Sequence, residues 1–139
     1  MAIFRPEDEA KVRELFDALE RPVELVVALG PEETPQHGAR DVDFGAETVR
    51  VVEELAALSD NVAYRVGAEA ERYPTVFVRP EGEEVGVSYC GLPWGYELSS
   101  LVGAIVEAGR REPSLTPESL EALRALDRDL AIDVFVTPT

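Results

Sequence analysis

An almost unbroken apolar run over residues 23–29 constrains the fold more than any other feature of this chain. Only Glu24 interrupts the run, so apolar side chains fall on both faces of an extended segment. This pattern is typical of an interior strand in a sheet that helices cover. Gly30-Pro31 ends the run, and a polar loop follows to about residue 44. The sequence therefore predicts an α/β domain with a functional loop after this strand.

The flanking residues predict a β-α-β unit preceded by a helix. Pro6 and the acidic residues that follow it favour the start of a helix over residues 6–19. Apolar side chains at helical spacing predict a second helix over about 46–58, and a second strand follows at 62–66. The two strands should be parallel, joined by a right-handed crossover.

The second half of the chain predicts a hairpin and two further helices. Strands are expected at 75–78 and 84–90, joined by a Pro-Glu-Gly turn and therefore antiparallel. A helix should span 96–108. Thr116-Pro117-Glu118 is a strong start for a last helix, and the apolar run 130–136 predicts a strand of the same character as 23–29.

The strongly acidic composition excludes several classes of partner. The 139 residues carry a formal net charge of −15, which opposes binding to nucleic acid or to anionic lipid. No apolar run approaches the ~20 residues that span a bilayer. The first residues lack the pattern of a secretory signal, so we expect a cytoplasmic protein of one ordinary domain.

Cys90 and His37 are the only cysteine and the only histidine. The chain therefore has no intramolecular disulfide, no C-x-x-C dithiol and no Cys–His metal cluster. No phosphate-binding glycine motif is present, and we expect no metal, no cofactor and no catalytic residue. Cys90 is predicted to be a buried, inert small hydrophobe, with glutathionylation or an intermolecular disulfide as the alternative. His37 is expected to be an ordinary exposed residue.

The predicted order of elements resembles a thioredoxin fold with an added N-terminal helix. Tyr73-Pro74 directly precedes the third strand, where thioredoxin-like proteins carry a cis-proline. A proline has no N–H for the ladder and is expected at the start of a strand. The resemblance implies an α/β fold with a mixed four-stranded sheet flanked by helices, an extra N-terminal helix and a C-terminal helix-strand extension.

Longer segments resemble tandem thioredoxin proteins, in which two such units are fused. The segments are RPVELVVALG, VVEELAALSD, YCGLPWGYELSSLVGAI and SLEALRALDRDLAIDVFVTPT. They are similar to the glutaredoxin-like protein disulfide oxidoreductases and to the N-terminal domain of the flavoprotein of alkyl hydroperoxide reductase. The resemblance implies a thioredoxin-like domain over residues 1–112. It also implies that residues 113–139 resemble the start of a second unit.

The resemblance also implies where a dithiol would lie. In the tandem oxidoreductases a C-x-x-C follows the first strand, whereas this chain has GPEETPQHGARDVDFG there. In the flavoprotein the first unit has lost its cysteines and the second keeps them. The chain ends at Thr139, where a second unit's C-x-x-C would be expected to begin. We therefore expect a redox-inactive unit, related to disulfide oxidoreductases, that gives structural and docking support in a thiol–disulfide system.

Binding is expected in the groove where three loops of such a fold converge. These loops would offer residues 31–38, Tyr73-Pro74 and 92–94. The candidate partner-binding residues are Tyr73, Pro74, Leu92, Pro93 and Trp94. Backbone beside a cis-proline can pair with an extended peptide, and flat aromatic rings supply apolar contact. Packing of Trp94 on its own turn remains an equal alternative.

Two other functions stay open at this point. The chain is alternatively a free-standing protein-binding module that uses the groove or the strand 130–136. A single-cysteine redox enzyme acting through Cys90 is the third hypothesis. Expected partners are a thiol–disulfide protein or a second thioredoxin-like unit. Because an unpaired apolar edge promotes association, the strand 130–136 should fold back on its own domain or pair in a homodimer.

Overall fold

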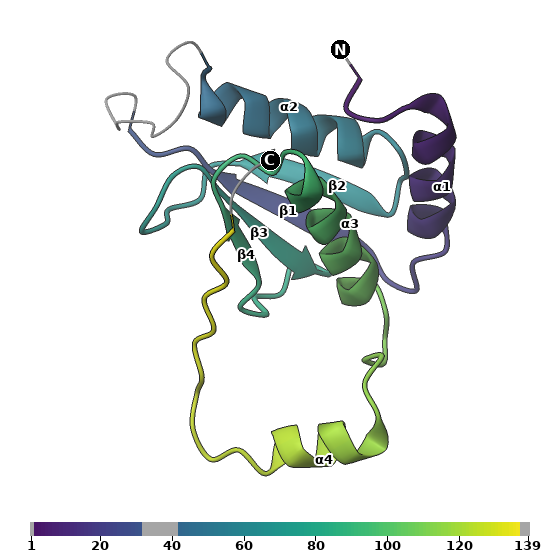
Figure 1. Ribbon diagram of the computed structural model, residues 1–139, viewed down its shortest axis with the longest axis vertical. Helices are drawn as coiled ribbons and strands as arrows, with labels where there is room; N and C mark the ends of the chain where they lie inside the picture. The colour runs from purple at the N-terminus through teal and green to yellow at the C-terminus, as the bar shows by residue number, and fades with distance from the viewer. Residues whose placement is uncertain (1, 32–41, 137–139) are drawn as a thin grey trace.

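The computed structural model describes residues 2–31 and 42–136, which form a four-stranded sheet with helices (Figure 1). The helices are α1 (Pro6–Asp17), α2 (Phe44–Ala56), α3 (Tyr96–Ala108) and α4 (Pro117–Arg124). The strands are β1 (Val23–Ala28), β2 (Val62–Val66), β3 (Thr75–Pro80) and β4 (Ser88–Cys90). Their order along the chain confirms the order predicted from the sequence.

The sheet is mixed, with the order β2-β1-β3-β4. β1 lies at its centre, parallel to β2 and antiparallel to β3, while β4 pairs with β3 in an antiparallel hairpin. The parallel β-α-β unit and the hairpin are both confirmed. This position explains why β1 is apolar. The strands on both sides satisfy its backbone hydrogen bonds, and both faces of an interior strand are covered by other parts of the protein.

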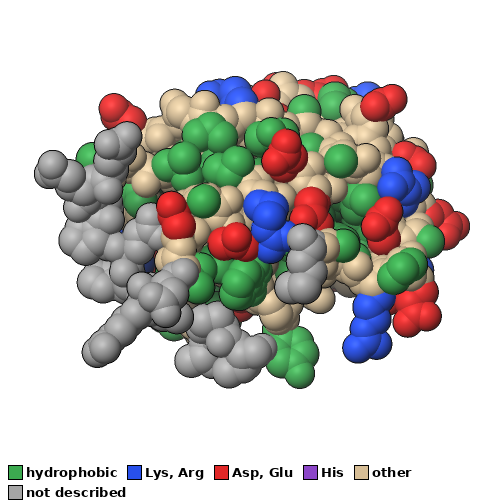
Figure 2. Space-filling view, turned by 90° about the horizontal axis from the view of Figure 1, so that it is seen from above, with side chains coloured by type: hydrophobic (Ala, Val, Ile, Leu, Met, Phe, Trp, Pro, Cys, Tyr) green, Lys and Arg blue, Asp and Glu red, His purple; other side chains and the backbone are tan. Residues whose placement is uncertain are grey.

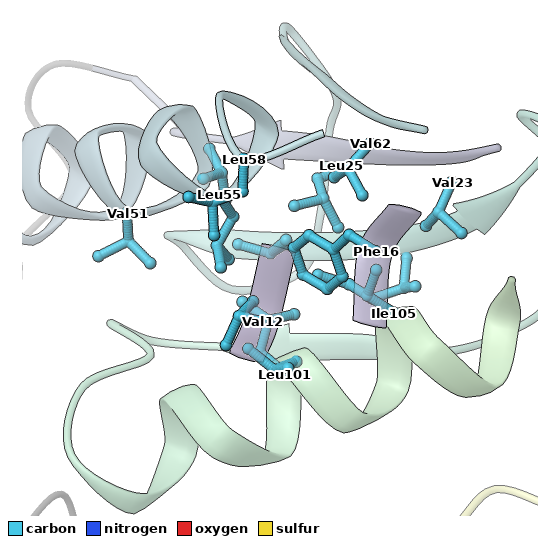
Figure 3. Close-up of a cluster of buried hydrophobic side chains, with 14 of the residues drawn as sticks. Val12, Phe16, Val23, Leu25, Val51, Leu55, Leu58, Val62, Leu101 and Ile105 are labelled. Atoms are coloured by element: carbon cyan, nitrogen blue, oxygen red, sulfur yellow. The ribbon is translucent and has the colours of Figure 1, made fainter. Parts of the chain in front are cut away.

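One face of the sheet carries the core (Figure 3). Alternate residues of β1 and β3, among them Leu25 and Val78, cluster there with side chains from α1, α2 and α3. Phe16 of α1, Leu55 of α2 and Ile105 of α3 are each fully buried in this cluster. The three helices therefore pack on the same face, and their shared apolar contact is the main stabilising feature of the fold.

Local capping explains where two helices begin. The side chain of Asp43 accepts a hydrogen bond from the Ala46 N–H at 3.0 Å, so α2 begins at Phe44, two residues before the predicted start. The side chain of Thr116 accepts from the Ser119 N–H at 3.2 Å, which starts α4 where the sequence predicted.

The opposite face of the sheet carries charged side chains beside buried apolar ones such as Val26. Arg65 of β2 pairs with Glu24 of β1 at 3.2 Å. The guanidinium of Arg79 lies 5.3 Å from the centre of the Phe77 ring, within range of a cation–π contact. This face is therefore more polar than the one that carries the core.

β4 is shorter than the strand predicted over residues 84–90. It spans only Ser88–Cys90, although the Val78 N–H still donates to the Val87 carbonyl at 3.1 Å. Gly86 adopts a positive φ of 73°, which interrupts extended backbone. Regular strand pairing in the hairpin is therefore limited to residues 75–77 and 88–90, beside the loops before β3 and after β4.

The C-terminal extension departs from expectation. α4 forms, but it contributes no buried residue and lies apart from the sheet in Figure 1. The strand predicted over 130–136 is wrong, since these residues pair with none of the described strands. A strand needs a ladder partner, and apolar sequence alone does not supply one. The segment instead runs beside β4, and residues 86–90 and 130–136 line one hollow of about 790 Å³.

Candidate partner-binding groove

The loop before β3 and the loop after β4 meet in a groove of about 610 Å³. All five residues predicted for partner binding lie in its lining: Tyr73, Pro74, Leu92, Pro93 and Trp94. Of the third predicted loop, residues 32–38 lie outside the described part of the chain. Phe44, at the start of α2, lines the groove as well. Val136, the last residue that the structure describes, also lines it, so the groove brings together side chains that are 92 residues apart in sequence, from Phe44 to Val136.

A short hydrogen bond fastens the two loops to each other. The peptide bond between Tyr73 and Pro74 is cis, as the resemblance implied. The carbonyl of Pro74 accepts from the Gly91 N–H at 2.8 Å. This bond holds the floor of the groove, where Pro74 is buried, in a fixed position relative to the turn that leads into α3.

Gly30, which lies just after β1, packs closely against the ring of Tyr73. Gly30 adopts a φ of +75°, and a Cβ atom added there would lie 2.6 Å from the Tyr73 ring. Only glycine fits both the backbone conformation and this close approach. The strand end thus sets the position of one aromatic wall of the groove.

Trp94 forms part of the other side. The Trp94 N–H donates to the Leu92 carbonyl at 2.9 Å, and the Trp94 carbonyl accepts from the Glu97 N–H at 3.2 Å. The backbone of the turn is therefore hydrogen-bonded on both sides of Trp94. Its side chain remains 40% exposed while lining the groove, so the indole offers contact area that its own turn does not cover.

The prediction that Cys90 is buried is wrong. Its side chain is exposed and lines the groove beside Pro74. Along β4 the side chains alternate, so Tyr89 packs against the core and Cys90 points to the other face. β4 is also an edge strand, and Cys90 therefore has a neighbouring strand on one side only. The thiol sulfur lies 3.5 Å from the hydroxyl oxygen of Thr75.

Solved structures of similar shape decide the fold. A mutant of the alkylhydroperoxide reductase AhpF from Enterococcus faecalis superimposes with a TM-score of 0.74 at 20% identity, covering 90% of this chain and 62% of that one. A protein disulfide oxidoreductase from Aeropyrum pernix gives 0.67 at 22% identity, covering 91% and 56%. The fold is thioredoxin-like. The mixed sheet, its flanking helices and the resemblance stated from the sequence are thereby confirmed.

Curated proteins with a related sequence are much longer than this chain. The F component of alkyl hydroperoxide reductase from Staphylococcus epidermidis is 26% identical over 129 residues, which are 93% of this chain and 23% of that protein. The NADH dehydrogenase of Bacillus subtilis strain 168 is 24% identical over 131 residues, 94% and 24% respectively. No family model matches the sequence. The chain thus spans about a quarter of the length of these relatives.

The thioredoxin-like fold also places groups in the groove that sequence reasoning missed. Tyr89 and Glu97 line it, and the Tyr89 hydroxyl donates to the Ser100 carbonyl at 2.9 Å. Burial raises the pKa of Tyr89, and the negative charge of Glu97 raises this pKa further. Both groups come from segments predicted correctly as strand and helix. Only the packing of α3 beside β4 shows that they meet.

Three other kinds of feature bear on function: metal sites, the histidine and membrane-spanning helices. Residues 2–31 and 42–136 contain no group of three or more His, Cys, Asp or Glu that could hold a metal ion. His37, the predicted ordinary loop residue, lies outside these ranges. Within the same part of the chain, no helix is long and apolar enough to cross a membrane.

Proposed function

We propose that this chain is a docking and structural unit of a thiol–disulfide system. It holds a segment of a protein partner in the groove, while a dithiol on another unit carries out the exchange. One observation carries the proposal: a thioredoxin-like fold with a formed groove has a single cysteine in its sequence. Dithiol exchange needs an attacking thiol and a resolving thiol, and one chain with Cys90 alone supplies only one.

The comparisons support the thiol–disulfide setting. The similar proteins include alkyl hydroperoxide reductase components and a protein disulfide oxidoreductase, and this chain matches only a part of each. In this proposal residues 1–112 form the thioredoxin-like domain and residues 113–139 belong to the connection with a second unit. The exposed apolar side chains of α4 and of residues 130–136, such as Leu123 and Phe135, would be covered by that unit.

The docking role is tested by NMR with a thiol-blocked polypeptide. Isotope-labelled protein is titrated with S-carbamidomethylated insulin B chain, which has no free thiol. Docking predicts amide shifts at Tyr73, Gly91 and Trp94. The variant Trp94→Ala should weaken these shifts, and Leu123→Ala on α4 should leave them unchanged. Absence of shifts in the groove, or shifts confined to other surfaces, would overturn the proposal.

The exposure of Cys90 favours a second candidate, a single-thiol unit that forms mixed disulfides. The sulfur of Cys90 would bond to one sulfur of a partner's disulfide, and the other sulfur would leave as a thiol. Cys90→Ser separates the two functions. Docking predicts that this variant keeps the groove shifts with the thiol-blocked polypeptide. The single-thiol function predicts that the protein associates only with partners that carry a disulfide. It also predicts that Cys90→Ser abolishes this association.

A further inference from the structure

We propose that the groove selects a partner segment in which a Lys or Arg side chain lies beside apolar residues. This inference rests on the proposed docking function and names the chemistry of its partner. The occupant is an extended segment of another protein.

Aromatic faces supply the first part of the argument. Tyr73, Tyr89 and Trp94 line the same groove. Tyr96, directly after the groove's last turn, is 79% exposed. A cation held over such rings is attracted by their negative faces, most strongly by a Trp. Apolar groups of a partner would gain from burial on the same rings. The groove therefore suits the alkyl stem and the charged head of a long cationic side chain.

Two carboxylates supply the second part. Glu71 and Glu97 line the groove, and Arg72 is the cationic side chain of its lining. Among the ion pairs of the described residues, none involves Glu71 or Glu97. Glu97 is half-buried beside Tyr89, where the attraction between opposite charges is stronger than in open water. A partner cation would therefore meet carboxylates that no Arg of the described chain already pairs with.

The charge of the whole chain points the same way. Figure 2 shows Asp and Glu side chains spread over the face that it presents, with cationic side chains among them. The formal net charge of −15 attracts cationic segments from a distance and slows the approach of anionic ones. The long-range attraction of the whole chain and the carboxylates of Glu71 and Glu97 in the groove therefore both favour a positively charged partner segment.

Trp94 provides a direct probe, since it is the only Trp in the chain. Its fluorescence is followed during titration with short Trp-free peptides that share apolar residues and differ at one central position: Lys, norleucine or Glu. The Lys peptide should bind about tenfold more tightly than the Glu peptide at low salt. In about 1 M salt, where screening acts within ~3 Å, this difference should fall below about threefold.

Matched variants locate the effect. Glu97→Gln should reduce the preference for Lys over norleucine by about fivefold. Glu118→Gln, on the exposed first turn of α4, should leave the preference unchanged. Equal binding of the Lys and norleucine peptides would overturn the charge selection and leave groove docking intact. Failure of all three peptides, together with the absence of NMR shifts in the groove, would overturn the proposed function itself.

Discussion

The Oγ1 of Thr75 lies 3.5 Å from the Sγ of Cys90, at the point where β3 and β4 pair directly. The same hydroxyl donates to the Arg72 carbonyl at 2.7 Å, within the loop that contains the cis-proline. Thr75 thus joins the thiol to this loop and holds Cys90 at the edge of the groove.

Cys90 should react with a chromogenic disulfide reagent in the folded protein, because its side chain is exposed. One thiol per chain is expected to titrate without denaturant, and the same amount in denaturant. Cys90→Ser, which has no thiol, is the control and should show no reaction with the reagent. Reaction only after unfolding would show that the thiol is buried, contrary to the structure.

Gly30→Ala should disturb both stability and the groove. A residue other than glycine at this positive φ costs about 1 kcal/mol, and the new methyl group would displace the Tyr73 ring. Gly82→Ala is the matched control, since Gly82 has a φ of +77° and open space around it. Both variants should lose stability in urea, but only Gly30→Ala should weaken peptide binding measured through Trp94. Equal loss of binding in the two would contradict the role assigned to the Tyr73 contact.

Two Leu→Ala variants separate the core from the C-terminal extension. Leu101 of α3 is 0% exposed, and its truncation should lower the free energy of unfolding by about 2–5 kcal/mol. Leu123 of α4 is 52% exposed, and its truncation should cost less than about 0.5 kcal/mol. Urea denaturation of both variants measures the difference. A large loss in Leu123→Ala would mean that α4 packs against the domain or against a second copy.

The pKa of Glu107 should lie below the ordinary value of a glutamate side chain. The Ser114 backbone N–H donates to its carboxylate, and so does the Ser114 hydroxyl, each at 2.9 Å. These bonds hold the pKa of Glu107 below its ordinary value of 4.5. The contribution of this contact to folding is therefore present above the unfolded pKa and is lost as the pH falls through the folded one.

NMR titration of the Glu107 side chain measures this pKa. Ser114→Ala removes the hydroxyl bond but keeps the larger contribution of the backbone N–H, so it should move the midpoint only part of the way toward 4.5. Ser119→Ala, a matched change on α4, should not move it. An unchanged midpoint in Ser114→Ala would show that the hydroxyl does not lower this pKa and would leave the backbone N–H as its cause.

The sequence was sufficient for the order of elements because periodicity and capping act locally. Residues 23–29 predicted a central strand, and Thr116-Pro117 predicted the start of α4, since each signal depends on neighbouring residues alone. The short β4 is a partial failure of the same method. Gly86 breaks the strand through its backbone conformation, which alternating valines in the sequence did not indicate.

The errors concern features that depend on distant parts of the chain. In an extended strand, neighbouring side chains such as those of Tyr89 and Cys90 point to opposite faces of the sheet. This rule does not show which face the helices cover, and it is Tyr89 that packs against the core while Cys90 is exposed. Residues 130–136 are apolar enough for a strand and find no ladder partner in the described sheet. The carboxylate of Glu97 joins the groove only through the packing of α3.

The central claim is that this thioredoxin-like unit catalyses no thiol–disulfide exchange of its own, and reduction of insulin disulfides by dithiothreitol tests it most directly. We predict that the protein does not raise the rate above the uncatalysed background, and that Cys90→Ser gives the same rate. Catalytic turnover by the protein that disappears in Cys90→Ser would contradict the account.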